Sequence, residues 1–172
     1  MSNDQNLLLP GVPLDSGKRR RGCLMGPDAY RTAGLERALR DLGHSVTDRG
    51  NVAPAPYHAE EHEKLHALEE TIAWTESLAA AADAAMDDGL PIFMGGDHAL
   101  ALGTVLGAMR HAEKAGRPPF VLWLDAHTDF HTPQTNDRGN PHGTPLRHAP
   151  RPQRLRRVPD IEHPAPTDTP PA

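Results

Sequence analysis

Two short apolar segments, each followed at once by a polar cluster, constrain the fold of this chain more than any other feature. Residues 90–94 (LPIFM) precede Gly-Gly-Asp-His at 95–98, and residues 120–124 (FVLWL) precede Asp-Ala-His-Thr-Asp at 125–129. Consecutive apolar residues are typical of strands that are buried on both faces, as in parallel sheets. A segment of helical composition precedes each one. The pattern therefore predicts βαβ units and an α/β fold with a parallel sheet.

The remaining segments continue this alternation of strands and helices. Gly43 and Gly89 mark the expected ends of two helices, because glycine readily adopts the left-handed conformation that follows a last helical turn. The expected strands cover residues 7–9, 44–50, 90–94 and 120–124, and the expected helices cover residues 27–42, 58–88 and 99–114.

The 172 residues are expected to form one domain followed by a tail. The domain covers residues 1–147. The tail, residues 148–172, has seven prolines from Pro150 onward, several arginines, no glycine and only three large aliphatic residues. Such a segment buries too little apolar surface to offset the entropy lost on ordering. We therefore expect it to be disordered.

The composition argues against several classes of protein. A formal net charge of -5 disfavours nucleic acid as the main partner, and we interpret the arginine-rich residues 18–21 and 154–157 as solvated loops. Cys23 is the single cysteine, so an internal disulfide framework is excluded. Apolar runs fall far short of the roughly 20 residues that span a membrane, and the N-terminus lacks the pattern of a secretory signal. We expect a soluble, cytoplasmic protein without a membrane partner.

The polar clusters after the two apolar segments are candidate metal ligands. Molecules and ions that bind to proteins with a parallel α/β sheet lie outside the carboxyl ends of the strands, and both clusters are expected at these ends. Asp125, His127 and Asp129 alternate along the chain, so an extended backbone would place them on one face. One imidazole with two carboxylates favours Mn²⁺ over softer metals, and His98 could complete the set. The alternative is that these groups only cap helices and turns.

A third candidate element is the segment 139–146 (GNPHGTPL). Its flanking glycines predict a tight turn that presents His142, which could shuttle protons near neutral pH. The alternative interpretation is a histidine on a surface turn.

A competing zinc motif lies at residues 62–66. His62, Glu63 and His66 match H-E-x-x-H, the pattern in which two histidines one helical turn apart bind zinc and the glutamate activates water. The surrounding segment is strongly acidic and offers no third ligand at a suitable spacing. We therefore favour a solvated helix face over a zinc metalloprotease site.

The three motifs, in this order, resemble signatures of the ureohydrolases and especially of the arginases. They are IFMGGDHALALG at 92–103, VLWLDAHTDFHTP at 121–133 and GNPHGTPL at 139–146. The upstream segment 26–50 (GPDAYRTAGLERALRDLGHSVTDRG) also resembles the first βαβ unit of arginases. The similarity covers about residues 5–147.

The resemblance implies a fold and a reaction. Arginases have a three-layer α/β/α fold with eight parallel strands in the order 2-1-3-8-7-4-5-6. They hydrolyse L-arginine to L-ornithine and urea with two manganese ions and are commonly homo-oligomers. The expected partner is therefore a small-molecule substrate, and the expected cofactor is Mn²⁺.

The resemblance also assigns roles to individual residues. His98 and Asp129 would bind one ion, His127 would bind the other, and Asp125 would bridge them. Asp129 and His142 would be catalytic, with His142 as the proton shuttle. Residues at the substrate would be His127, His131, Arg138 and Asn140, although many arginases have Asn in place of His131 and Ser in place of Arg138.

One family signature has no match in these 172 residues. It is approximately Ser-x-Asp-x-Asp-x-x-Asp-Pro, which supplies a second bridging carboxylate and a further metal ligand in the family. We therefore expect an incomplete arginase-like domain that holds only the first half of the sheet, strands 1 to 4. Its hydrolase activity would be impaired, and its oligomeric contacts incomplete. The alternative is an inactive truncated homologue or an interaction fragment.

Overall fold

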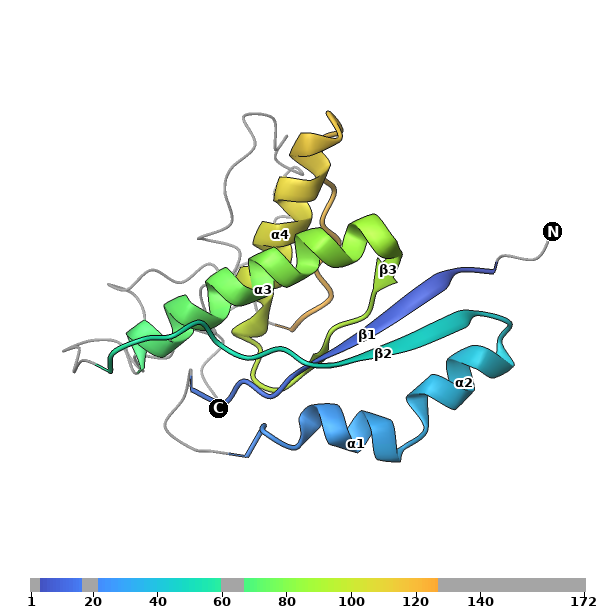
Figure 1. Cartoon of the computed structure of the whole chain (residues 1–172), viewed down its shortest axis with the longest axis horizontal. Helices are drawn as coiled ribbons and strands as arrows, with labels where there is room; N and C mark the ends of the chain where they lie inside the picture. The colour runs from blue at the N-terminus through green and yellow to red at the C-terminus, as the bar shows by residue number, and fades with distance from the viewer. Residues whose placement is uncertain (1–3, 17–21, 60–66, 127–172) are drawn as a thin grey trace, which may run out of the picture.

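The computed structural model describes residues 4–16, 22–59 and 67–126, and the statements below concern these residues. They form a parallel sheet between layers of helices (Figure 1). The strands are β1 (Asn6–Val12), β2 (Ser45–Asn51), β3 (Leu90–Pro91) and β4 (Met94–Gly95), and the helices are α1 (Gly26–Thr32), α2 (Leu35–Asp41), α3 (Leu68–Asp88) and α4 (Leu100–Lys114).

Strand β1 lies at the centre of the sheet. It pairs with β2 on one side, where Leu7 is opposite Val46, and with β3 and then β4 on the other, where Leu7 is opposite Leu90. Every residue from Leu7 to Val12 is buried. The order β2-β1-β3 is the arrangement expected at one end of the arginase sheet.

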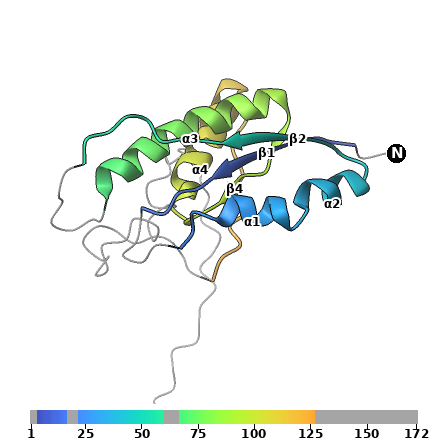
Figure 2. The ribbon, with the colours of Figure 1, turned by 60° about the horizontal axis from the view of Figure 1, so that its bottom comes forward.

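Helices cover both faces of the sheet (Figure 2), and each face has its own apolar cluster. On one face, Leu7 and Leu9 of β1 pack with Leu35 and Leu39 of α2. On the other face, the buried members of the cluster come from the end of β1, from α3 and from the start of α4: Val12, Leu14, Trp74, Leu78 and Ala99. The three-layer α/β/α prediction is confirmed.

Helices α3 and α4 approach closely because α4 carries two glycines one turn apart. A Cβ atom built on Gly107 would lie 2.5 Å from the carbonyl oxygen of Ala79 and 2.6 Å from the Cβ of Ala82. A Cβ on Gly103 would lie 2.5 Å from the Cβ of Leu78. Because these two glycines have no side chain, the backbones of α3 and α4 can lie close together.

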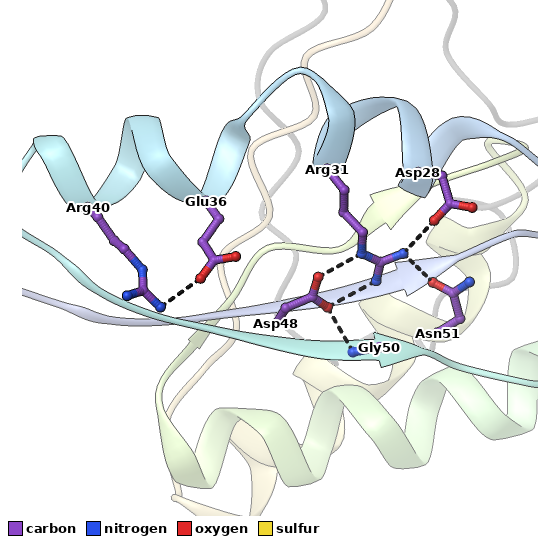
Figure 3. A network of polar contacts seen from close by, with 7 residues as sticks. All are labelled: Asp28, Arg31, Glu36, Arg40, Asp48, Gly50 and Asn51. Carbon is purple, nitrogen blue, oxygen red and sulfur yellow. Dashed lines mark hydrogen bonds and ion pairs between the residues drawn. The ribbon is translucent and has the colours of Figure 1, made fainter.

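A polar network connects α1 to β2 (Figure 3). The Arg31 guanidinium donates to both carboxylate oxygens of Asp48, at 2.7 and 3.0 Å, and also donates to Asp28 and Asn51. Asp48 additionally accepts from the backbone N–H of Gly50 at 2.8 Å. The hydrogen bonds from Arg31 lower the pKa of Asp48, so its carboxylate is held in the charged form.

Two expected helices differ from the structure. The helix predicted over residues 27–42 is divided into α1 and α2, because Gly34 has a φ of 82° and interrupts the helical backbone. The helix predicted over residues 58–88 begins at Leu68, and residues 58 and 59 have no regular structure.

The strand predicted over residues 90–94 is divided into β3 and β4.

The strand predicted over residues 120–124 is wrong for this structure. The segment has no regular secondary structure, and Phe120, Leu122 and Leu124 are 88%, 70% and 85% exposed. Among the described residues it has no neighbouring strand. Its apolar composition therefore indicates a tendency to be buried, but strand formation also requires a hydrogen-bonding partner.

Other expectations fall partly outside the described residues. The boundary between the domain at 1–147 and the tail at 148–172 lies outside the described residues. His62, Glu63 and His66 of the zinc motif also lie outside them. Within the described part, no helix is both long enough and apolar enough to cross a membrane.

The α3–α4 contact can be tested with Gly107→Ala. At an exposed helix position this change would stabilise the protein by about 1 kcal/mol. Here the new methyl meets the backbone of α3, so we expect a loss of about 1–3 kcal/mol in the free energy of unfolding, measured in urea. Glu113→Ala, at an exposed position of the same helix, is the control and should change stability by less than about 0.5 kcal/mol. Stabilisation by Gly107→Ala would contradict the packing described.

The Arg31–Asp48 pair predicts a dependence of stability on pH. The pKa of Asp48 is lowered from its ordinary value of 3.8, so its stabilising contribution is complete above that value and is lost as the pH falls through the lowered pKa. We expect Asp48→Asn to lower stability by about 1 kcal/mol at pH 7 and by progressively less below pH 4. Thermal unfolding as a function of pH measures this difference.

The control for this experiment is Asp41→Asn. Asp41 is paired with Arg37 at 3.8 Å in an exposed position, so this change should leave stability nearly constant at every pH. If the difference in stability between Asp48→Asn and the wild type does not become smaller at acid pH, Asp48 acts through something other than its charge.

Candidate metal centre

The candidate site lies at the carboxyl end of the sheet, where the chain leaves β4 and turns into α4. The backbone N–H of Gly96 donates to the carbonyl of Val12 at 3.3 Å, and that of Asp97 donates to the carbonyl of Leu14 at 2.7 Å. A Cβ on Gly96 would collide with both of these carbonyls. Glycine is therefore required for the turn to lie this close to the end of β1, and His98 follows directly from this anchored turn.

Asp97 stabilises the same turn. Its side chain is almost fully buried, and Oδ1 accepts a hydrogen bond from the backbone N–H of Ala99 at 2.9 Å. This is an Asx turn, in which the carboxylate replaces a backbone acceptor. The sequence pattern alone gives Asp97 no role of its own. The signal that could have identified it is its position three residues before the first residue of α4.

The structure brings His98 and Asp125 together, although they are 27 positions apart in the sequence. The distance from His98 Nε2 to Asp125 Oδ2 is 3.8 Å, and the two side chains are 40% and 25% exposed. This distance is too long for a hydrogen bond. A single ion could span it, because two metal–ligand bonds of about 2.1 Å reach up to about 4.2 Å.

The chemistry of these two donors fits a divalent cation. A neutral imidazole and a carboxylate together suit Mn²⁺, Fe²⁺ or Zn²⁺, and partial exposure leaves the site open to solvent. Two ligands do not by themselves hold an ion firmly. Within residues 4–16, 22–59 and 67–126, no group of three or more histidine, cysteine or acidic side chains is arranged to hold a metal.

An aromatic ring adjoins this pair of side chains. The ring centroids of His98 and Trp123 are 5.3 Å apart, and the ring planes are inclined at 82°, which is an edge-to-face arrangement. Trp123 is only two residues from Asp125. The sequence pattern places Trp123 in a buried strand and does not indicate this contact.

The other expected site residues lie outside the described part of the chain, and their roles stay predictions. They are the candidate ligands His127 and Asp129, the candidate proton shuttle His142, and the candidate substrate contacts His131, Arg138 and Asn140.

Comparison with known sequences identifies relatives of this chain. The model for the arginase family matches residues 5–159. The arginase of Brucella melitensis is 52% identical over 138 residues, which make up 79% of this chain and 45% of that protein. The arginase of Agrobacterium fabrum is 46% identical over 139 residues, which are 79% of this chain and 43% of that protein.

Solved structures agree with these sequence matches. The native arginase of Bacillus caldovelox superposes with a TM-score of 0.72 at 36% identity, over 83% of this chain and 48% of that one. An Entamoeba histolytica arginase in complex with L-ornithine gives a TM-score of 0.71 at 28% identity, over 83% of this chain and 48% of that one. The chain therefore spans about half the length of the relatives it matches. Because the family model covers most of its residues, the chain belongs to the arginase family.

Proposed function

We propose that this chain carries one part of the active site of a cytoplasmic manganese hydrolase that converts L-arginine and water to L-ornithine and urea. The observation that carries the proposal is the approach of His98 Nε2 to Asp125 Oδ2 at 3.8 Å in a member of the arginase family. The related Entamoeba arginase, solved with L-ornithine, supports this choice of substrate class.

In this proposal the metal ligands come from two neighbouring turns. His98 follows the glycine turn after β4, and Asp125 begins the cluster that continues to His127 and Asp129. When bound, a pair of Mn²⁺ ions would supply a water activated for attack at neutral pH on the guanidinium carbon of the substrate. His98 and Asp129 would hold one ion, His127 would hold the other, and Asp125 would bridge them.

The remaining residues would orient the substrate and move protons. His142 would transfer a proton to the departing amine, because an imidazole titrates near neutral pH. His127, His131, Arg138 and Asn140 would contact the substrate, and Arg138 could pair with the α-carboxylate of L-arginine. These roles extend the family assignment to residues outside the described part of the chain.

A second candidate function is that of a metal-binding chain without catalytic activity. The observation that favours it is that the described residues contribute only one imidazole and one carboxylate to the site. Metal binding and urea formation must therefore be measured separately.

The proposal predicts that His98→Ala and Asp125→Asn each weaken Mn²⁺ binding by at least about tenfold, because the first removes a ligand and the second removes the negative charge of another. Binding can be followed by the loss of the EPR signal of free Mn²⁺, and hydrolysis by urea production from L-arginine. His58→Ala, at an exposed position, is the control and should match the wild type. Binding without urea formation would support the non-catalytic alternative. Equal binding by wild type and both ligand variants would refute the site.

The zinc motif is tested in the same titration. A variant with His62→Ala and His66→Ala should bind Mn²⁺ as the wild type does. If this variant loses Zn²⁺ while the wild type takes up no Mn²⁺, the metalloprotease interpretation would replace the present proposal.

A further inference from the structure

We propose that His111 is a proton-dependent clamp that holds the carboxyl end of α4 against the carboxyl end of α3. Its side chain is 21% exposed and faces two carboxylates of α3. The Nδ1 atom of His111 is 3.7 Å from Asp83 Oδ1 and 3.6 Å from Asp87 Oδ1. His111 lies about three helical turns beyond His98, so the inference does not depend on the proposed metal site.

The spacing of residues along α4 places His111 in the contact with α3. Gly103 and Gly107 face α3, because a Cβ atom on either one would collide with atoms of that helix. His111 lies one further turn along the same face, since residues four apart are neighbours on a helix surface. The contacts of these positions advance along α3 from Leu78 to Asp87, so the two helices run in the same direction (Figure 1).

Two helix ends of the same sign therefore meet at this cluster. The carboxyl end of a helix has a negative partial charge, which a cation stabilises and an anion destabilises. The last turn of α3 contains Asp87 and Asp88 and no basic residue. Asp88 is paired with Arg49 of β2 at 2.6 Å, whereas Asp87 faces His111. A positive charge on the imidazole offsets both the Asp87 carboxylate and the end of α3.

The two oxygens of the Asp83 carboxylate differ in their partners. Oδ2 accepts a hydrogen bond from Lys114, whereas Oδ1 is buried and accepts none within the described part of the chain. A buried acceptor without a donor costs free energy. His111 Nδ1 faces this oxygen at 3.7 Å, which is too long for a hydrogen bond. A protonated imidazole has an N–H on both nitrogens, and a side-chain movement of about 1 Å would complete the bond.

Two cations of α4 act against this attraction. Lys114 and Arg110 repel a protonated imidazole, but both side chains are exposed, so water screens their charges. Asp83 is 18% exposed and is screened less. The hydrogen bond from Lys114 also lowers the pKa of Asp83, so this carboxylate remains ionised near pH 6.5, where an ordinary imidazole takes up its proton.

Folding is therefore coupled to proton uptake at His111. The protonated imidazole has two carboxylates beside it in the folded chain and loses them on unfolding. Its stabilising contribution is thus present at mildly acid pH and is lost as the pH rises through about 6.5 and above. The contribution of Asp48 changes only below about pH 4, so the two effects can be measured separately.

The test measures the folding equilibrium constant of the full chain by urea unfolding at about pH 5.5 and about pH 8, with EDTA present. The pH ratio is the constant at the lower pH divided by the constant at the higher pH. We expect the wild type to have a pH ratio about threefold to fivefold larger than that of His111→Gln. His58→Gln, at an exposed position, is the matched control and should have the pH ratio of the wild type.

Asp87→Asn separates the clamp from a general effect on the fold. Asp87 is 72% exposed, so the variant should fold. It should lower the pH ratio about twofold, because the protonated imidazole loses the charge of one partner. Stability at about pH 8 should not fall, because the change removes a negative charge from the carboxyl end of α3. In the His111→Gln background, Asp87→Asn should leave the pH ratio unaltered.

Three outcomes would overturn this inference. The first is an equal pH ratio in His111→Gln and the wild type. The second is an equal fall of the pH ratio in His58→Gln, because the effect would then belong to histidines in general. The third is an unchanged pH ratio in Asp87→Asn, because the proton on His111 would then act through something other than α3. None of these measurements involves Mn²⁺, so failure of the proposed function and failure of the clamp are distinguishable.

Discussion

The backbone of β1 and its continuation to Leu14 is the constraint on which the described structure depends. Its polar groups pair with β2 on one side and with β3 and β4 on the other. Beyond the strand, the carbonyls of Val12 and Leu14 accept from Gly96 and Asp97. Since buried backbone groups must be paired, one segment near the N-terminus determines where the turn carrying His98 can lie. The same segment contributes to the apolar clusters on both faces of the sheet.

Small residues complete this arrangement by allowing backbones to approach. Gly96 admits the turn against the end of β1, and Gly103 and Gly107 admit α4 against α3. Helix α4 begins two residues after His98, so its packing on α3 also limits how the turn can move. The polar network of Arg31 acts elsewhere, between α1 and β2, and is partly exposed. Backbone hydrogen bonds and the burial of apolar side chains therefore position the site, and the ion pairs contribute less.

The alternation of strands and helices predicted the parallel sheet, and the resemblance to arginases predicted the three layers. The approach of His98 to Asp125 was expected from two neighbouring strand ends, although the segment before Asp125 is not a strand in the structure. The sequence was not sufficient for residues 120–124. An apolar run indicates burial, but a strand also needs a neighbour, and the partner of a strand is not encoded in its own residues. The division at Gly34 was missed because the apolar pattern continues across it. Asp97 acts locally, on the N–H of Ala99, and its position before α4 is the signal for it, whereas the contact of Trp123 with His98 joins residues that are distant in sequence.

These differences bear on how the candidate metal site is assembled. His98 is tied to the sheet through backbone hydrogen bonds, whereas Asp125 follows a segment that pairs with no strand in the described structure. The separation of the two donors is therefore not set by strand pairing. Side-chain contacts between the segments contribute to it instead, and the edge-to-face contact of Trp123 with His98 is one of them. Two donors held in this way take their relative position from side-chain packing as well as from backbone hydrogen bonds, so apolar residues contribute to the geometry of the candidate site.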